Sequence, residues 1–357
     1  MDKLKNIGIL TSGGDCPGLN AAIRGIAKPL VERYGKRVVG FIDGYKGLIE
    51  DRAIELKSRD LSGILTLGGT ILGTSRQPFK VLKNSPDMVQ KMIDNYKKHN
   101  LDCLVVLGGN GSHKTAGLLS AMGLNIIGLP KTIDNDLFGT DYAFGFYTAV
   151  DIATGVIDRI HSTARSHGRI MIIEFMGHSA GWLTLYSGIA GGADVILIPE
   201  LPYSTNRVIE KLKEREIQGK NFSIIAVAEG AKTITETFMT EKEFKRERKK
   251  MKYSSLGYKV ADDLKKETDY EIRVTVPGYQ QRGGEPSPYD RILATKFGTY
   301  AVEMIKNKEY GKMVAIVDNK ITAIPLSEVA GKTKPVPKDH EMINAGRTLG
   351  TSFGQPL

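Results

Sequence analysis

Short apolar runs alternate with segments of helical character along most of this 357-residue chain. The runs have the length of strands and are bounded by glycine, proline or polar residues. The strand candidates are residues 7–10, 38–41, 101–107, 126–129, 170–175, 195–198, 223–227 and 313–317. A strand that is apolar throughout is buried on both faces of its sheet, and helices between strands provide that cover. The alternation therefore predicts an α/β fold with mainly parallel sheets covered by helices.

The composition is that of a large soluble enzyme with two or more lobes, at 41% hydrophobic and 25% charged residues. No apolar run approaches the roughly 18 residues that cross a bilayer, and residues 1–6 are too polar and too few for a signal peptide. Cys16 and Cys103 are the only cysteines, and their separation forms no metal-ligand motif. We therefore expect a cytoplasmic protein in a reducing compartment, with no membrane partner.

A basic run at residues 245–252 contributes to the formal net charge of +10. The charge suits anionic substrates. Nucleic-acid binding would need interleaved aromatic residues or a recognisable module, and only Tyr253 lies nearby. We expect no nucleic-acid partner, and interpret the polar stretch 231–270 as a helical elaboration with a solvated, charged face.

Two glycine-rich turns each follow an apolar run and precede a helical segment. The first spans residues 11–20, between the run 6–10 and the helical residues 21–27. The second spans residues 108–112 and opens the helical stretch 114–122. Bare backbone N–H groups beside a helix start predict an anion site, although glycine turns also serve as plain connections. Neither turn has the spacing of a P-loop or of the dinucleotide-binding fingerprint.

Two carboxylates follow the fourth apolar run, in the segment Leu-Pro-Lys-Thr-Ile-Asp-Asn-Asp at residues 129–136. Asp134 and Asp136 lie two residues apart, so one can accept a proton from a substrate hydroxyl while the other shapes the field or holds a metal-bound water. Taken alone, the cluster also fits a turn in which Asp and Asn side chains bond their own backbone. With the two glycine loops, it indicates phosphoryl transfer.

Arginines border glycine turns in two further strand-like segments, residues 168–177 and 273–284. Arg169 opens the first, and Arg273 and Arg282 lie near the two ends of the second. Such positions favour anion ligands, since a guanidinium pairs well with phosphate; solvated surface charge is the alternative.

These motifs together resemble the 6-phosphofructokinase family, from residue 6 to about residue 300. The resemblance rests on Ser-Gly-Gly-Asp-x-Pro-Gly-x-Asn-Ala at residue 12, Gly-Gly-x-Gly-Ser at 108, Pro-Lys-Thr-Ile-Asp-Asn-Asp at 130, Met-Gly at 176, Ala-Glu-Gly at 228 and Gln-Arg-Gly-Gly at 281. It implies two Rossmann-like lobes with the active site in the cleft between them. Residues 1–145 plus 281–331 would bind the phosphoryl donor, and residues 146–280 plus 332–357 the sugar phosphate.

The resemblance also implies roles for single residues. Asp134 would deprotonate the sugar 1-hydroxyl beside Thr132 and Asp136, with Arg76 and Lys131 stabilising the transferring group. The expected ATP-binding residues are Gly14, Arg76, Gly109, Asn110, Gly111 and Ser112. The expected substrate-binding residues are Thr132, Asp134, Arg169, Met176, Gly177, His178, Glu229, Arg273, Tyr279 and Arg282. Arg169 and Arg273 would come from a neighbouring subunit, which requires a homotetramer or homodimer.

The resemblance leaves the phosphoryl donor open, because the superfamily that this chain resembles contains both ATP-dependent and pyrophosphate-dependent members. At position 111, pyrophosphate-dependent members carry an aspartate, which would crowd and repel a nucleotide. Gly111 is therefore similar to the ATP-dependent members. A lysine at position 131 is similar to the pyrophosphate-dependent members. The combination of Gly111 with Lys131 resembles a mixed-substrate branch of the family. We expect ATP, because a steric and charge block is harder to evade than an added cation. The alternative donor is pyrophosphate.

Three residues depart from the family pattern. Asn110 replaces a common magnesium-binding aspartate, so Asn110 and Asp136 are the expected Mg²⁺ ligands, with one charge fewer. His178 replaces an arginine and Tyr279 a histidine, which weakens the expected contacts to phosphate. These departures leave open a different class of function: a catalytically impaired paralogue that binds sugar phosphate and regulates a partner.

Overall fold

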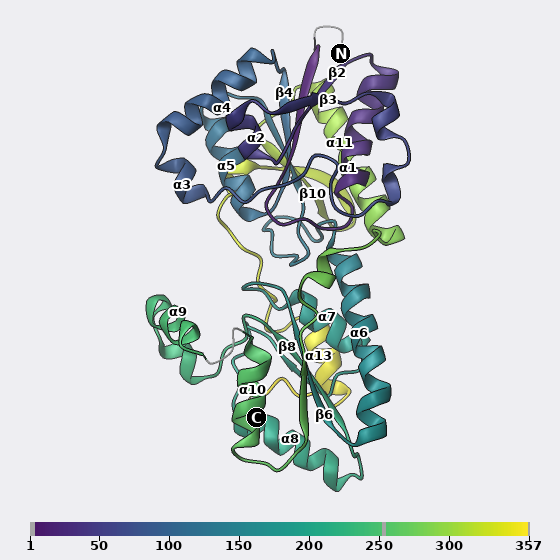
Figure 1. Ribbon diagram of the computed structural model, residues 1–357, viewed down its shortest axis with the longest axis vertical. Coiled ribbons are helices and arrows are strands. Elements are labelled where there is room, and N and C mark those ends of the chain that lie inside the picture. The colour runs from purple at the N-terminus through teal and green to yellow at the C-terminus, as the bar shows by residue number, and fades with distance from the viewer. Residues whose placement is uncertain (1–3, 252–254, 356–357) are drawn as a thin grey trace. The chain divides into compact units, whose positions relative to one another are not determined.

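The computed structural model describes residues 4–251 and 255–355, and the chain divides into two compact units (Figure 1). The first unit comprises Met1–Ile133, Leu137–Thr148 and Arg282–Lys334; the second comprises Asp134–Asp136, Ala149–Gln281 and Pro335–Leu357. Each unit has its own sheet, and each is described separately.

The sheet of the first unit has seven strands in the order β11-β10-β5-β4-β1-β2-β3. Their bounds are β1 Asn6–Ser12, β2 Arg37–Phe41, β3 Ala53–Glu55, β4 Cys103–Gly108, β5 Ile126–Pro130, β10 Lys312–Val317 and β11 Lys320–Pro325. The strands from β2 to β10 run parallel, whereas the edge strands β3 and β11 pair antiparallel with β2 and β10. Because β2 lies on one side of β1 and β4 on the other, the strand order reverses at β1. Ligands of open parallel sheets bind beyond the carboxyl ends of strands at such a reversal.

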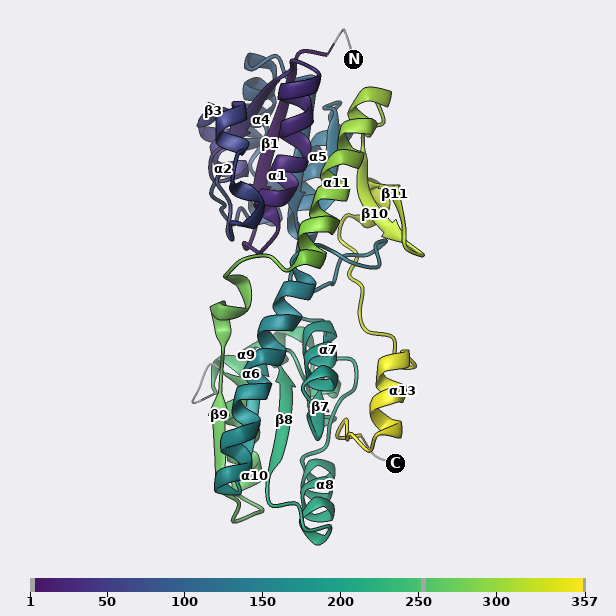
Figure 2. The ribbon, with the colours of Figure 1, turned by 90° about the vertical axis from the view of Figure 1, so that its right-hand side faces the viewer.

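Helices cover both faces of this sheet, and α1 and α11 pack against each other (Figure 2). The bounds are α1 Leu19–Lys28, α2 Tyr45–Glu50, α3 Phe79–Lys83, α4 Pro86–Lys98, α5 Asn110–Ala121, α11 Pro288–Asn307 and α12 Leu326–Val329. Short 3₁₀ or π turns occupy Pro29–Arg33, Ser58–Leu61 and Ile64–Thr66.

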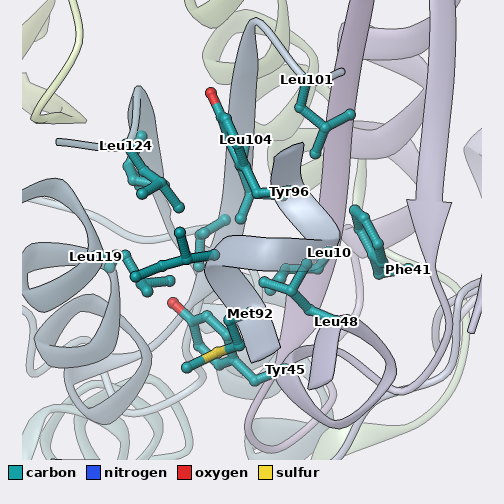
Figure 3. Packing of buried hydrophobic residues seen from close by; sticks show 14 of the residues in the cluster. Leu10, Phe41, Tyr45, Leu48, Met92, Tyr96, Leu101, Leu104, Leu119 and Leu124 are labelled. Carbon is teal, nitrogen blue, oxygen red and sulfur yellow. The ribbon is translucent and has the colours of Figure 1, made fainter. Parts of the chain in front are cut away.

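The helix α4 shows how the core of the first unit forms. Val89, Met92, Ile93 and Tyr96 recur at the spacing of one helix face, and all are buried. They join side chains of α2, α5, β1, β2 and β4 in one apolar cluster (Figure 3). Within it, the hydroxyl of Tyr45 donates to the backbone oxygen of Ser112 at 2.9 Å, which ties α2 to the first turn of α5.

The second unit has a four-stranded sheet in the order β7-β8-β6-β9, in which every pair is parallel. The strand bounds are β6 Ile170–Phe175, β7 Val195–Leu197, β8 Ser223–Ala228 and β9 Ile272–Thr275. The helix bounds are α6 Phe146–His167, which begins in the first unit, α7 Trp182–Ala190, α8 Thr205–Ile217, α9 Glu241–Lys249, α10 Leu256–Lys265 and α13 Glu341–Thr348. Further 3₁₀ turns occupy Thr235–Phe238 and Gly278–Arg282. Here the strand order reverses at β6, between β8 and β9.

The helix α9 confirms the helical elaboration expected within the basic stretch, and it projects from the rest of the second unit (Figure 1). The capping box of Thr240 and Glu243 starts it. The Arg246 side chain is 67% exposed, as expected of a solvated face. The expectation is wrong for Arg248, whose side chain is only 17% exposed because it turns back toward the unit.

The predicted α/β architecture is confirmed, and each strand candidate coincides with a strand of the structure. Sequence reasoning missed β3 and β11. It also placed the start of α5 four residues late, since the helix begins at Asn110 rather than at Lys114. Across the part of the chain that the structure describes, no helix is long and apolar enough to span a membrane.

Candidate active site

Both glycine loops lie at the carboxyl ends of paired strands in the first unit. Ser12, the last residue of β1, pairs with Gly108, the last residue of β4. The first loop therefore starts beside the second, although 96 positions separate the two residues in sequence. They meet at the strand reversal, where an open parallel sheet binds its ligand.

The first loop needs glycine because of its backbone conformation. Gly13 has φ +91° and Gly18 has φ +101°, values that other residues rarely adopt. The backbone N–H of Gly13 donates to the backbone oxygen of Ser75 at 3.0 Å, and the hydroxyl of Thr74 donates to the backbone oxygen of Gly13 at 2.8 Å. The segment that leads to Arg76 is thus fixed beside the loop.

Two guanidinium groups approach the backbone at Gly14. A Cβ atom placed there would lie 2.8 Å from Nη1 of Arg282 and 3.4 Å from Nη2 of Arg76. Nη1 of Arg282 also donates to the backbone oxygen of Asp15 at 3.1 Å. Gly14 therefore leaves room for a cationic cradle that suits phosphate. The structure places Arg282 in this cradle, whereas most of the residues expected to share its sugar-phosphate role, Met176 and Glu229 among them, lie in the second unit.

Lys131 joins the two loops. Its Nζ donates to the backbone oxygen of Gly14, and its backbone N–H donates to the backbone oxygen of Gly108 at 3.0 Å. The residue is only 3% exposed. A buried ammonium needs an acceptor, and the Gly14 backbone oxygen supplies one, so Lys131 brings positive charge between the loops. A merely solvated Lys131 is excluded.

The second loop forms the first turn of α5. Gly108 permits the close approach of Ser112, because a Cβ atom at Gly108 would collide with the Ser112 side chain. Gly109 is the N-cap residue, and Asn110, Gly111 and Ser112 follow in the first turn, where N–H groups have no partner within the helix. Their N–H groups and the positive helix end can receive phosphate oxygens.

Gly111 faces open space. A Cβ atom there would have no neighbouring heavy atom within 4 Å, and its φ lies outside the left-handed region. Glycine is thus not required at this position by packing or by backbone conformation. A side chain added at Gly111 would instead occupy space beside the helix N-terminus.

His113 lies buried in the same helix, with its ring against Gly128 of β5. Burial, assisted by the charge of Lys131, lowers the pKa of His113 to about 4. Above about pH 4 the His113 ring is therefore neutral in the folded protein. In the unfolded chain the same ring binds a proton below about pH 6.5.

A prediction about stability follows from His113. As pH falls from about 6.5 to 4, its contribution to the free energy of unfolding should decline by roughly 3 kcal/mol, because only the unfolded state gains the proton. The variant His113→Phe lacks this titration. Urea unfolding of both proteins at a series of pH values should show the wild type losing more stability over this interval. Parallel curves would show that His113 does not titrate in this way.

The acidic segment follows β5 directly. The Thr132 backbone N–H donates to the backbone oxygen of Phe144 at 3.4 Å, and both Thr132 and Asp136 are buried. Asn135 has φ +48°, so the chain turns sharply between Asp134 and Asp136. Asparagine tolerates this conformation well. The structure thus places both carboxylates on a turn.

The fit of a Mg²⁺ ion rests on few protein ligands. Among residues 4–251 and 255–355, no group of three or more His, Cys, Asp or Glu side chains could hold a metal. Asn110 donates to the backbone oxygen of Lys332 at 2.9 Å and accepts from the N–H of Gly331 at 3.1 Å. Its amide therefore ties α5 to this segment, with one oxygen lone pair left for a cation. So few protein ligands suit a Mg²⁺ ion that is held chiefly by phosphate oxygens and water. Asp136 is the carboxylate expected to assist.

In the second unit, candidate sugar-binding residues lie beyond the carboxyl ends of β6 and β8. Met176, Gly177 and His178 follow β6, and Glu229 follows the neighbouring strand β8. Oε1 of Glu229 accepts the backbone N–H of His178 at 2.8 Å. Gly177 has φ +146° and His178 has φ +53°, so this loop has an unusual backbone. The parallel pairing explains why motifs 53 positions apart meet at Met176 and Glu229.

Gln281 is a contact that sequence reasoning missed. Its side chain is fully buried, and Oε1 accepts the backbone N–H of Met176 at 3.2 Å. Gln281 and Met176 share the wall of a 110 Å³ cavity with Glu229 and Tyr279. Tyr279 is 81% exposed, so its ring is free to meet a ligand. The only sequence signal was the position of Gln281 beside Arg282.

Arg169 and Arg273 lie at the opposite end of this sheet. Arg169 precedes β6, Arg273 is the second residue of β9, and both ion-pair with Oε1 of Glu271, at 2.9 and 2.5 Å. They are therefore separated by the length of β6 from Met176 in the same chain, at about 3.3 Å per residue. These two arginines do not join the other substrate residues of their own unit.

Two candidate ligand sites result: a cationic, amide-rich cradle in the first unit and a polar pocket in the second. The first has the geometry of a phosphate site, and a carboxylate turn follows the adjacent strand. This set of groups supports phosphoryl transfer, in which positioning and charge stabilisation do most of the work.

Comparison with known proteins identifies the family. The family model described as Phosphofructokinase matches residues 6–305, which is most of the chain. The chain belongs to the phosphofructokinase family. A curated relative from Spirochaeta thermophila, named ATP-dependent 6-phosphofructokinase, is 58% identical over 357 residues and is matched over 98% of both chains. A Bacteroides thetaiotaomicron protein, named ATP-dependent 6-phosphofructokinase 3, is 48% identical, with 98% of this chain and 99% of that one covered.

Solved structures of phosphofructokinases share the fold. The Saccharomyces cerevisiae phosphofructokinase matches with a TM-score of 0.78 and 32% identity; the alignment covers 91% of this chain and 45% of that one. This chain thus spans about half the length of that yeast chain. A pyrophosphate-dependent phosphofructokinase from Marinobacter aquaeolei has a TM-score of 0.80 at 23% identity, over 98% of this chain and 92% of that one, which is a likeness of fold.

Proposed function

We propose that this phosphofructokinase family member transfers the γ-phosphoryl group of Mg-ATP to the 1-hydroxyl of fructose 6-phosphate, giving fructose 1,6-bisphosphate. The observation that carries the proposal is the cradle of the first unit. Lys131 bonds the first glycine loop, Arg76 and Arg282 flank Gly14, and the first turn of α5 begins beside them. The names of the two curated relatives support ATP as donor.

In this proposal the first unit binds the donor. The backbone amides of the Gly14 loop and of Gly109 to Ser112 receive phosphate oxygens, and Arg76 and Lys131 stabilise the charge that develops on the transferring group. The amides and the buried Lys131 are held before substrate arrives, so they need little reorganisation during the reaction.

Asp134 accepts the proton of the 1-hydroxyl as that oxygen attacks, beside Thr132 and Asp136. Bound Mg²⁺ would neutralise phosphate charge. The protein groups that would hold it are the carboxylate of Asp136 and the side-chain oxygen of Asn110, through its remaining lone pair.

The second unit binds fructose 6-phosphate through Met176, Gly177, His178, Glu229 and Tyr279, and Arg282 is a further expected substrate ligand. Arg169 and Arg273 lie at the far end of their own sheet, so we propose that they serve the site of a neighbouring subunit. The functional form would then be a homotetramer or homodimer.

Pyrophosphate remains the second candidate donor because of Lys131. A buried ammonium against Gly14 supplies positive charge that a small inorganic donor could use. The relative of that donor class reported above shares only the fold, and Gly111 leaves room for a nucleotide. Both points favour ATP.

A coupled assay of fructose 1,6-bisphosphate formation tests the proposal. The purified protein should turn over fructose 6-phosphate with Mg-ATP, and faster than with pyrophosphate. Faster turnover with pyrophosphate would assign the second donor. Sugar-phosphate binding without turnover from either donor would instead indicate a regulatory paralogue.

A prediction about His178 addresses the least typical substrate residue. His178 is exposed and borders a cavity with Glu229. If a neutral imidazole is a weak phosphate ligand, His178→Arg should lower KM for fructose 6-phosphate or raise kcat by about fivefold or more, since a charge-assisted hydrogen bond replaces a neutral one. Steady-state kinetics at neutral pH measure the change, and Ser179→Arg, which adds the same charge one position along, is the control.

The competing view is that His178 is adapted to its site. Lower activity of His178→Arg than of the wild type, with Ser179→Arg unchanged, would contradict the weak-ligand interpretation.

A further inference from the structure

A cavity of about 710 Å³ adjoins the proposed sugar-phosphate residues in the second unit. His178, Glu229 and Gly230 form one side, and Phe244 and Arg248 of α9 form another. The basic stretch that sequence analysis left without a role thus contributes to the wall beside the site.

Arg248 holds the chain just after Glu229. Its Nη2 donates to the backbone oxygen of Ala231 at 2.6 Å and pairs with Oε2 of Glu236 at 3.3 Å. Its guanidinium carbon lies 4.8 Å from the centre of the Phe244 ring, a cation–π distance. These contacts fix a mostly buried guanidinium against the turn.

The turn from Ala228 to Ala231 is fixed from its other side by β6. The backbone N–H of Ala231 donates to the backbone oxygen of Ala228 at 2.9 Å, and that of Glu229 donates to the backbone oxygen of Phe175 at 2.9 Å. Gly230 has no space for a side chain, since a Cβ atom there would collide with the backbone oxygen of His178. The turn that Arg248 contacts at Ala231 is thus the same turn that carries Glu229, whose carboxylate accepts the backbone N–H of His178.

We propose that Arg248 is a positioning residue for fructose 6-phosphate: its hydrogen bond to the backbone oxygen of Ala231 holds the Ala228–Ala231 turn so that Glu229 meets the sugar. This inference rests on the proposed function of the second unit. Arg248 acts through Glu229 and does not need to touch the substrate. The contacts named for Arg248 join it to residues of the second unit.

The test compares two neighbouring arginines of α9. Arg248→Met keeps the length of the side chain and removes its donors, while Arg246→Met makes the same change at a 67% exposed position. Arg248→Lys restores a charged donor. The readouts are KM for fructose 6-phosphate and for ATP, kcat, direct binding of fructose 6-phosphate by calorimetry, and the melting temperature.

We expect R248M to raise KM and Kd for fructose 6-phosphate by about tenfold, the effect of one charge-assisted hydrogen bond, with kcat and KM for ATP within twofold. R248K should recover part of this loss, and R246M should behave as wild type. Unchanged sugar affinity in R248M, or equal changes in both KM values that follow the melting temperature, would overturn the proposal.

Folding and function are separated by two further comparisons. If R248M does not fold, Arg248→Gln, which stays polar but is too short to maintain the same contacts, is judged by the same criterion. A wild-type protein inactive toward fructose 6-phosphate would refute the proposed function, whereas an R248M variant equal to an active wild type would refute only the role of Arg248.

Discussion

Replacing Asp134 with serine is expected to lower kcat by about 10²- to 10⁴-fold while fructose 6-phosphate still binds. Loss of a general base acts mainly on the transition state, because the proton leaves the 1-hydroxyl only as the new bond forms. Asp134 follows β5 and lies in the turn that contains the left-handed Asn135. Steady-state kinetics, together with calorimetric titration of fructose 6-phosphate, would measure the two effects separately.

Asp87→Ser provides a matched control, because Asp87 is an exposed residue in the first turn of α4. It should leave kcat unchanged. A folded Asp134→Ser variant with near-normal turnover would remove Asp134 from the mechanism, and a variant that loses sugar binding and turnover together would indicate a binding role instead.

Replacing Gly111 with aspartate is expected to lower kcat/KM for ATP by about 10²-fold or more, since like charges brought together cost several kcal/mol. The new carboxylate would lie in the first turn of α5, beside the N–H groups proposed to bind phosphate. The fold should tolerate it, because a Cβ atom at Gly111 meets no neighbour within 4 Å. Activity with pyrophosphate, where measurable, should fall much less.

Gly111→Asn separates charge from size, because asparagine has nearly the shape of aspartate without its charge. It should lose less ATP activity than Gly111→Asp. Equal losses with ATP and pyrophosphate in Gly111→Asp would show that this position does not discriminate between donors.

The strands that could be predicted and those that could not differ in burial. The strands β1, β4, β5, β6 and β8 are almost wholly buried, so their sequences are mainly apolar runs that stand out from the more polar residues around them. The edge strands β3 and β11 contain no buried residue. Their conformation depends on pairing with β2 and β10, and pairing leaves no apolar pattern in the sequence.

The start of α5 was missed because glycine has a low helix propensity. Its first-turn N–H groups need no intrahelical partner, so Gly111 costs little there and leaves those groups accessible. Gln281 was missed for another reason: its bond to Met176 joins residues 105 positions apart, and no local pattern marks such a contact.

The sequence by itself determined the class of fold, the family and the chemical types of the candidate residues, because those depend on local order: strand, glycine turn, helix, and carboxylates after a strand. Only the tertiary structure decided which residues meet. Parallel pairing of β1 with β4 brings Ser12 beside Gly108, and packing brings Arg282 to the backbone at Gly14 and Lys131 to its carbonyl oxygen. Strand register and burial set these distances, and both arise from contacts between segments far apart in the chain.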